Sequence, residues 1–187
     1  MDVEYEVRIL NIEVEKIRKK LEKLGAKLIF DTIQKRYVYD FNPKVKNKCI
    51  RLRTNGNKTT LTIKNLTSNE INGTEELEIE VSDFFKTNSL LKELGYEAKG
   101  YQENRRIQYN LNDVEIDIDY WPLIPTYIEI EGKNEGDVYK TLQLMGLDKN
   151  DVTTKDVQSI YLDYGYNLNE IYELRLEEER IWLYLKN

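Results

Sequence analysis

The chain of 187 residues contains no histidine and a single cysteine, Cys49. The absence of histidine removes the commonest general base and every metal centre that imidazole ligands would build. One cysteine allows neither an intrachain disulfide nor a cysteine-cluster zinc site. Any chemistry must therefore depend on carboxylates, lysine, arginine and tyrosine.

The chain also lacks long apolar runs and clustered positive charge. No stretch approaches the roughly 18 residues that a membrane span requires, so we expect no membrane partner, no signal or transit peptide and a cytoplasmic location. A net charge of −6 without a basic run argues against duplex nucleic acid as a partner, because phosphate-backbone binding needs a positive footprint. The length predicts one domain with a core of its own.

Strands of alternating polar and apolar residues dominate the pattern. The stretch 3–10 alternates without a break, and the alternation returns at 76–81, 114–119 and 127–131. A period of two places the charged side chains of each strand on one face. One such strand is typical of a solvated sheet face with cross-strand ion pairs. Four of them in one small domain favour a shared charged lining.

Turn residues separate the strands. The Asn-Gly pair at 55–56 and the Asn-Asp pair at 112–113 each follow an alternating run and predict tight hairpins. The stretch 26–41 is rich in strand-forming residues, and we predict two pieces broken near Asp31.

Three segments repeat one order of elements, a Glu-x-Glu strand, a helix and then Leu-Gly or Met-Gly: 4–25, 76–95 and 129–146. Such recurrence predicts a pseudo-symmetric sheet that curls. In the second segment we expect the helix to bury Phe84, Leu90, Leu91 and Leu94. Residues 168–185 also have a helical pattern. We therefore divide the chain into a main domain at 1–165 and a C-terminal helical extension at 166–187 that packs on it or forms a homodimer.

These elements predict an α+β fold, an eight-stranded antiparallel β-barrel with helices packed outside. Helices on the outer face bury the apolar side of each strand, so the charged side lines the bore. By parity, the lining carries Glu4, Glu6, Glu76, Glu78, Glu80, Asp117, Asp119, Glu129 and Glu131, together with Arg8, Arg51, Arg53, Lys64 and Arg106.

An acidic lining of this density needs cations. Two like charges about 4 Å apart repel by roughly 4 kcal/mol at an effective dielectric constant near 20. Oxygen ligands suit Mg²⁺ or Mn²⁺, and the opposing basic residues suit a polyanion. A site that binds a metal ion and a polyanion and catalyses mainly by positioning and electrostatics is typical of phosphoryl or nucleotidyl transfer. We expect Glu6→Gln and Glu129→Gln to abolish metal-dependent activity but to leave the fold intact or stabilised, because each removes repulsion.

The ordered set of motifs resembles the CYTH superfamily, the triphosphate tunnel metalloenzymes, over Glu4 to about Tyr161. Residues 4–8 are similar to the family's Glu-x-Glu-x-Lys strand, 50–53 to its Leu-Arg-x-Arg strand and 61–64 to its Thr-x-Lys strand. Residues 75–81 resemble its Arg-Glu-Glu-x-Glu strand, especially in the cyclase branch. Arg106 and Tyr109 match the family's Lys-x-Arg-x-x-Tyr strand. Asp119 precedes Glu129 and Glu131 at the spacing of the family's acidic pair. Residues 159–161 are similar to the Ser-Tyr motif at the end of the family pattern.

The resemblance implies a tunnel that binds a triphosphate-bearing small molecule and one or two Mg²⁺ or Mn²⁺ ions. It implies metal ligands at Glu4, Glu6, Asp119, Glu129 and Glu131, phosphate contacts at Arg8, Arg51, Arg53, Lys64 and Arg106, and catalytic roles for Arg8 and Lys64. Three positions depart from the family pattern, with Arg8 for a lysine, Thr74 for an arginine and Asn104 for a lysine. Arg8 keeps its charge but cannot act as a base.

The leading functional hypothesis is a class IV adenylyl cyclase-like enzyme that converts ATP to cyclic AMP and pyrophosphate. The cyclase-like strand at 75–81 favours it. One alternative is a triphosphatase acting on an organic or inorganic triphosphate, similar to thiamine triphosphatase or tripolyphosphatase. Another is a non-catalytic triphosphate-binding module, which the three departures favour.

Overall fold

The computed structural model describes residues 1–176. Its elements in chain order are β1 (Asp2–Leu10), α1 (Val14–Lys23), β2 (Lys27–Asp40), β3 (Lys48–Thr54), β4 (Thr59–Leu66), β5 (Thr74–Glu80), α2 (Phe84–Glu93), β6 (Ala98–Leu111), β7 (Val114–Tyr120), β8 (Tyr127–Gly132), α3 (Glu135–Met145), η1 (Lys149–Asp151), α4 (Val157–Asp163), η2 (Leu168–Glu170) and β9 (Glu173–Leu174).

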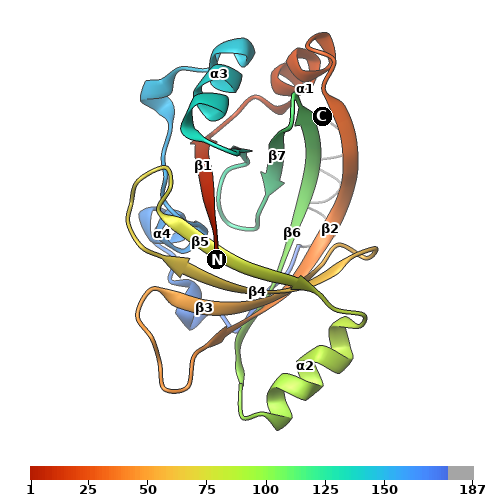
Figure 1. The fold of residues 1–187 in the computed structure, drawn as a ribbon, viewed down its shortest axis with the longest axis vertical. Helices are drawn as coiled ribbons and strands as arrows, with labels where there is room; N and C mark the ends of the chain where they lie inside the picture. The colour runs from red at the N-terminus through yellow and green to blue at the C-terminus, as the bar shows by residue number, and fades with distance from the viewer. Residues whose placement is uncertain (177–187) are drawn as a thin grey trace.

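Strands β1 to β8 form a closed antiparallel barrel (Figure 1). They are hydrogen-bonded in the order β2-β3-β4-β5-β1-β8-β7-β6, and the long pairing of β2 with β6 closes the ring. The short strand β9 is added to β6 in parallel. This arrangement confirms the predicted α+β barrel with helices outside.

Both predicted hairpins are confirmed. Thr54 lies opposite Thr59 at the end of the β3–β4 pair, and Gly56 in the turn has a φ of +91°. Between β6 and β7, Asn112 and Asp113 have φ values of +55° and +65°. Two consecutive left-handed residues are typical of a type I′ turn, whose twist matches that of the strands. These turns fix the register, and the register decides which side chains point inward.

The three repeated segments become β1–α1, β5–α2 and β8–α3. Each helix is followed by a glycine in the left-handed region, Gly25, Gly95 and Gly146, where other residues would be strained. Helices α1 and α3 bury Leu21 and Leu142 against the outer faces of β1, β6, β7 and β8. Helix α2 lies at the opposite end of the barrel (Figure 1). Apolar burial outside the barrel leaves its inner face to polar side chains.

Two expectations about these elements are wrong. Residues 27–40 form one continuous strand with register shifts against β6 between Leu28 and Phe30 and between Val38 and Tyr39, and without a break near Asp31. In α2, Phe84 and Leu91 are buried, but Leu90 and Leu94 are 60% and 65% exposed. Only one face of α2 contacts the barrel, so the helix buries half of the expected side chains.

The expected C-terminal helical extension lies partly within the described residues. There, residues 166–176 form a 3₁₀ turn at Leu168–Glu170 and the strand β9 instead of a long helix. Residues 177–187 lie outside the described residues, and the homodimer stays a prediction. None of the helices within 1–176 combines the length and apolar character that crossing a membrane demands.

Candidate functional site: a charged tunnel

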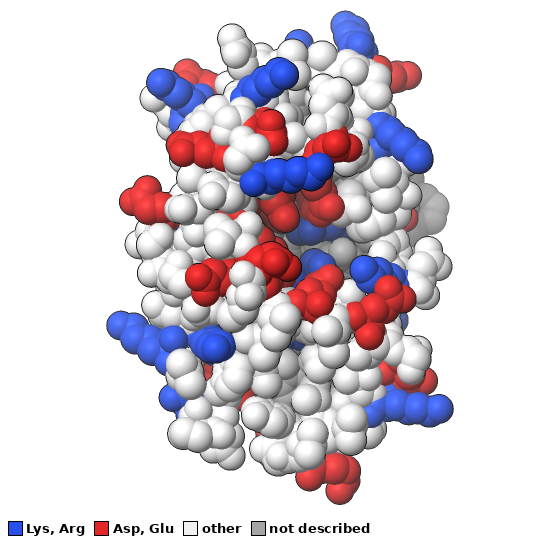
Figure 2. All heavy atoms as spheres, in the orientation of Figure 1, with Lys and Arg blue, Asp and Glu red and all other residues white. Residues whose placement is uncertain are grey.

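The inward faces of the strands surround a cavity of about 720 Å³. Figure 2 shows acidic side chains around a hollow in the middle of one face, with basic side chains visible inside it. Asp117 and Asp119 are buried in the wall and pair with Arg106, whereas Glu80 is exposed and lies 3.8 Å from Lys58. The other predicted residues line the cavity itself: Glu4, Glu6, Glu76, Glu78, Glu129, Glu131, Arg8, Arg51, Arg53, Lys64 and Arg106.

One part of the cavity gathers four glutamates, Glu4, Glu6, Glu115 and Glu131, and we call this group the acidic end. In the strand register Glu131 lies opposite both Glu6 and Glu115. Side chains directly opposed on one sheet face are about 5 Å apart, so these carboxylates repel one another. Burial and the neighbouring carboxylates raise the pKa of Glu131 to about 8. Within residues 1–176, Glu131 takes part in no ion pair.

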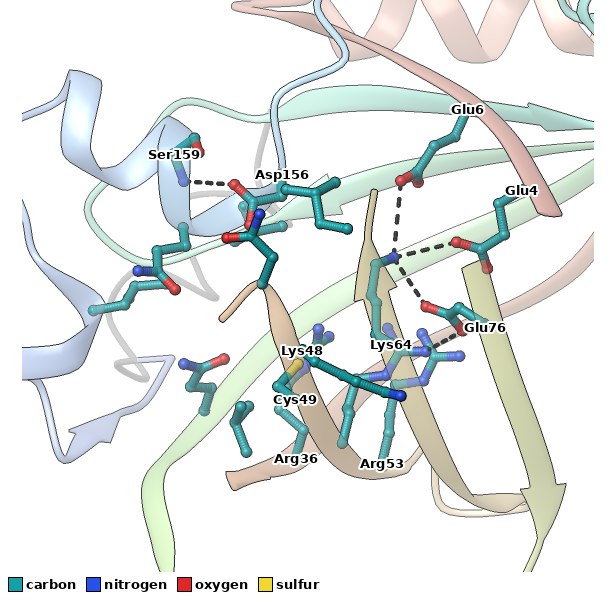
Figure 3. A pocket seen from close by; sticks show the side chains of 18 of the residues that line it. Glu4, Glu6, Arg36, Lys48, Cys49, Arg53, Lys64, Glu76, Asp156 and Ser159 are labelled. Atoms are coloured by element: carbon teal, nitrogen blue, oxygen red, sulfur yellow. Dashed lines mark hydrogen bonds and ion pairs between the residues drawn. The ribbon is translucent and has the colours of Figure 1, made fainter. Parts of the chain in front are cut away.

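Lys64 contacts three carboxylates at and beside the acidic end (Figure 3). Its Nζ lies 2.9 Å from Glu76 Oε1, 3.2 Å from Glu4 Oε2 and 3.8 Å from Glu6 Oε1. Burial opposes the ammonium charge, but Glu6 and Glu76 outweigh it and raise the pKa of Lys64. Burial nevertheless raises the pKa of Glu4 to about 7, with Lys64 opposing and Glu76 and Glu6 adding to the effect. Arg8 also pairs with Glu6 at 2.6 Å, so the under-neutralised carboxylates of the acidic end are Glu4 and Glu131.

Tight ion pairs occupy the middle of the cavity wall. Arg8 Nη2 lies 2.5 Å from Glu129 Oε2, and Arg106 Nη2 lies 3.1 Å from Glu129 Oε1. Arg106 also donates two hydrogen bonds, of 3.0 and 2.6 Å, to the carboxylate of Asp119. Burial opposes ionisation of Glu129, but Arg8 and Arg106 outweigh it and hold the pKa of Glu129 well below its usual range. These charges are compensated within the protein.

Three arginines gather elsewhere in the cavity, and we call Arg36, Arg51 and Arg53 the arginine cluster. Arg36 lies directly opposite Arg53 in the pairing of β2 with β3. Arg51 Nη2 is 3.1 Å from Glu76 Oε2, whereas the ion pair of Arg53 is a 3.8 Å contact with Glu78. Burial and Arg51 lower the pKa of Arg53 to about 10, and burial with Arg53 and Arg51 lowers that of Arg36 to about 9. This cluster therefore carries excess positive charge.

The cavity lining also includes residues that are missing from the sequence-based list, among them Arg36, Glu115, Trp121 and Tyr127. The face of β2 that carries Arg36 also carries Gln34 and Val38, so it lacks the charged alternation that marked the other strands. Glu115 belongs to the alternation at 114–119 and needed only the same parity count. Trp121 and Tyr127 carry no charge pattern, so the sequence offered no signal for them.

Positions 74 and 104 lack the cation of the family pattern. Each holds a neutral side chain that donates a hydrogen bond to a carboxylate. Thr74 Oγ1 donates to Glu6 Oε1 at 3.3 Å, and Asn104 Nδ2 donates to Asp119 Oδ1 at 2.8 Å. Both residues are buried. A neutral donor satisfies a carboxylate oxygen without neutralising it, so the substitutions leave negative charge in the cavity.

The acidic end has the donor chemistry of a divalent-metal site. Carboxylate oxygens are the ligands that Mg²⁺ and Mn²⁺ prefer, and a bound cation would relieve the repulsion at Glu131. Within residues 1–176, no three acidic or cysteine side chains converge closely enough to form a finished metal site. Instead, the Lys64 ammonium contacts Glu4, Glu6 and Glu76. The residues thus fit such an ion by ligand type and by excess charge.

A closed antiparallel barrel with oppositely charged groups inside it defines a tunnel protein with a polar interior. The model of the CYTH domain family matches residues 2–155, and the chain belongs to this family. The match confirms the resemblance that the sequence motifs indicated. Among curated proteins, no match to the chain was found.

Solved structures of the same fold cover most of the chain. The PH1012 protein from Pyrococcus horikoshii OT3 is 25% identical, with a TM-score of 0.71 over 86% of this chain and 99% of that one. A candidate adenylate cyclase from Vibrio parahaemolyticus is 14% identical, with a TM-score of 0.73 over 86% and 98%. A candidate adenylyl cyclase from Hippeastrum with a dominant triphosphatase activity is 15% identical, with a TM-score of 0.59 over 91% and 100%. These likenesses establish the fold.

Proposed function

We propose that the protein is a divalent-metal-dependent enzyme that acts on a nucleoside or other organic triphosphate bound in its tunnel. The main support is that one cavity holds two sets of unbalanced charge, carboxylates at the acidic end and guanidiniums in the arginine cluster. A triphosphate needs cationic groups around its oxygens and brings metal ions that carboxylates can hold. The family and its cyclase-like and triphosphatase members are consistent with this assignment.

The proposed roles follow the charges. The phosphate groups bind Arg8, Arg51, Arg53, Lys64 and Arg106, and Mg²⁺ or Mn²⁺ binds Glu4, Glu6, Asp119, Glu129 and Glu131. When bound, the ion neutralises charge on phosphoryl oxygens. Asp119 and Glu129 already pair with Arg106. Glu6 likewise pairs with Arg8, so we expect Glu4 and Glu131, whose pKa values are raised, to make the larger contribution to metal affinity.

Arg8 and Lys64, the proposed catalytic residues, act as fixed positive charges. Burial opposes the charge of Arg8, but Glu129 and Glu6 outweigh it and raise its pKa, as Glu6 and Glu76 do for Lys64. Neither side chain can accept a proton near neutral pH. Their role is to stabilise negative charge that develops on the transferred phosphoryl group.

We favour class IV adenylyl cyclase-like chemistry. The 3′-hydroxyl oxygen of ATP loses its proton to solvent and attacks the α-phosphorus, the bond from that phosphorus to the bridging oxygen breaks, and pyrophosphate leaves as cyclic AMP forms. The strand at 75–81, now seen as β5, resembles the cyclase branch and favours this reaction. A triphosphatase would direct water at the γ-phosphorus through the same charged residues, releasing phosphate.

A product assay tests the proposal. The protein is incubated with Mn²⁺ and ATP, thiamine triphosphate or tripolyphosphate, and the products are resolved by chromatography. Cyclic AMP with pyrophosphate would support the cyclase, and ADP with phosphate would support the triphosphatase. A protein that binds these compounds but converts none of them would contradict the enzymatic proposal.

A non-catalytic triphosphate-binding module is the second candidate. The neutral Thr74 and Asn104, where the family pattern has cations, favour it because both contact acids that the missing cations could otherwise neutralise. Calorimetry that detects binding of ATP and Mn²⁺ without turnover, under conditions that support an active relative, would select this candidate.

A further inference from the structure

Arg36 lies inside the cavity on β2 and is only 7% exposed. Figure 3 shows its side chain beside that of Arg53. In the strand register Arg53 lies opposite it on β3, and Gln102 lies opposite it on β6. The guanidinium is thus buried next to another positive charge.

Arg36 differs from the other arginines of the cavity because no carboxylate of residues 1–176 forms an ion pair with it. Its Nη2 donates to two neutral oxygens, Gln34 Oε1 at 3.1 Å and Asn104 Oδ1, and its Nε has no hydrogen-bond partner among the described residues. In contrast, a carboxylate oxygen lies 3.8 Å or closer to each of the other four, Arg8, Arg51, Arg53 and Arg106. A buried charge without a counter-ion destabilises a folded protein, so its presence calls for an explanation.

The surroundings hold this guanidinium in one orientation. Its Cζ lies 4.5 Å from the centroid of the Trp121 ring, a cation–π contact that a buried site strengthens. Asn104, which accepts from Arg36, is itself fixed by donating to Asp119 Oδ1 at 2.8 Å. The Nε donor that remains unused belongs to a planar group whose geometry matches phosphate oxygens.

We propose that Arg36 is a phosphate-binding residue that, with Arg53, contacts one phosphoryl group of the polyphosphate chain. The inference rests on the proposed triphosphate ligand and adds a residue to its binding site. The ligand supplies the counter-ion that Arg36 lacks among residues 1–176. The Trp121 ring and the Asn104 amide position the guanidinium before the ligand arrives, which lowers the entropic cost of binding.

Calorimetry with inorganic tripolyphosphate in the presence of EDTA tests this role without metal or turnover. Arg36→Gln is expected to weaken binding about tenfold or more, because it removes a charge-assisted hydrogen bond. Lys35→Gln is the matched control, since Lys35 is the neighbouring residue, is exposed and carries the same charge. It should change the dissociation constant by less than about twofold.

Thermal unfolding of the ligand-free proteins separates binding from a structural role. Removing an unpaired buried charge should leave the melting temperature unchanged or raise it. Arg36→Met retains an unbranched apolar stem against Trp121 and should lose affinity as Arg36→Gln does, so it replaces the glutamine variant if that variant does not fold. Adding Asn104→Lys to Arg36→Gln restores a cation at the same point and should recover most of the lost affinity.

The outcomes separate this inference from the proposed function. Parent protein that binds tripolyphosphate but converts no triphosphate would refute the enzymatic function and leave the role of Arg36 intact. Parent protein that converts a triphosphate while the Arg36 variants bind as tightly as it does would refute the role of Arg36 alone. A lowered melting temperature with unchanged affinity would make Arg36 a structural residue. Parent protein that binds neither tripolyphosphate nor ATP would overturn both.

Discussion

The acidic end and the arginine cluster are opposite in sign but alike in being under-compensated. Burial and neighbouring carboxylates raise the pKa of Glu131 to about 8, and burial with neighbouring guanidiniums lowers that of Arg36 to about 9. In both cases the protein disfavours the charged form. Between them, burial opposes ionisation of Glu76, but Arg51 and Lys64 outweigh it and lower its pKa to about 2.

Paired charges in the cavity stabilise the fold, whereas unpaired charges are the ones that a ligand would neutralise. A paired group such as Glu129 is stabilised in its charged form by Arg8 and Arg106 and contributes to stability. An unpaired group such as Glu131 or Arg36 lowers stability until an ion of opposite sign arrives. Because the two unpaired groups differ in sign, the cavity is suited to two different ligands, a cation and a polyanion.

The largest expected effect on stability comes from removing Arg106 from the buried ion pairs of the cavity wall. Arg106→Gln leaves Asp117, Asp119 and Glu129 without the guanidinium they share. Removing one partner of a buried ion pair costs about 3–5 kcal/mol, and we expect the free energy of unfolding to fall by that amount. Urea denaturation at pH 7 measures it.

Arg105→Gln is the control for this measurement. Arg105 is the next residue on β6, and its hydrogen bonds of 2.7 Å to Asp31 lie near the surface. Water compensates the loss of such a pair, so we expect a change below about 1 kcal/mol. Similar losses in the free energy of unfolding for the two variants would show that the buried pairs of Arg106 contribute no more to stability than a surface pair.

The second effect is smaller and has the opposite sign. Because the pKa of Glu131 is raised from 4.5 to about 8, its ionisation destabilises the fold as the pH rises through that window. Glu131→Gln should therefore stabilise the ligand-free protein by about 1–2 kcal/mol at pH 8.5. At pH 4 the two proteins should unfold alike. Denaturation curves at both pH values provide the measurement, and equal stability at pH 8.5 would refute the repulsion.

The smallest effect is expected at Glu80, which shares the inward parity of β5 but is exposed beyond the cavity. Its 3.8 Å contact with Lys58 is a surface ion pair. Glu80→Gln should change stability by less than about 0.5 kcal/mol and leave tripolyphosphate affinity unaltered. A clear loss of affinity, measured by calorimetry, would extend the binding region to this strand end.

The sequence was informative about the barrel because alternation and turn chemistry are local properties. The pairs at 55–56 and 112–113 set two registers directly, and the alternation showed which faces were charged. The continuity of β2 was hidden, since the register shift between Leu28 and Phe30 interrupts the period. Arg36 was missing from the expected lining because its face of β2, with Gln34 and Val38, has no repeated charge.

The ion pairs within the cavity could not be predicted from the alternation of side chains along each strand. Parity places side chains on a face but does not say which charges meet across the bore. The reason for expecting Glu129→Gln to leave the fold intact or stabilised, relief of repulsion, does not apply, because Glu129 contacts both Arg8 and Arg106. Glu6 is likewise paired, at 2.6 Å from Arg8 Nη2. We expect both substitutions to destabilise the fold, whereas relief of repulsion is confined to unpaired acids such as Glu131.

A crossed calorimetric experiment tests most directly whether the two unbalanced regions hold oppositely charged ligands. Parent protein, Glu131→Gln and Arg36→Gln are each titrated with Mn²⁺ alone and with tripolyphosphate in EDTA. We predict that Glu131→Gln weakens Mn²⁺ binding by about tenfold or more but not tripolyphosphate binding, and that Arg36→Gln does the reverse. Equal losses of both ligands in both variants, or no loss in either, would contradict the separation of charge on which the proposed function depends.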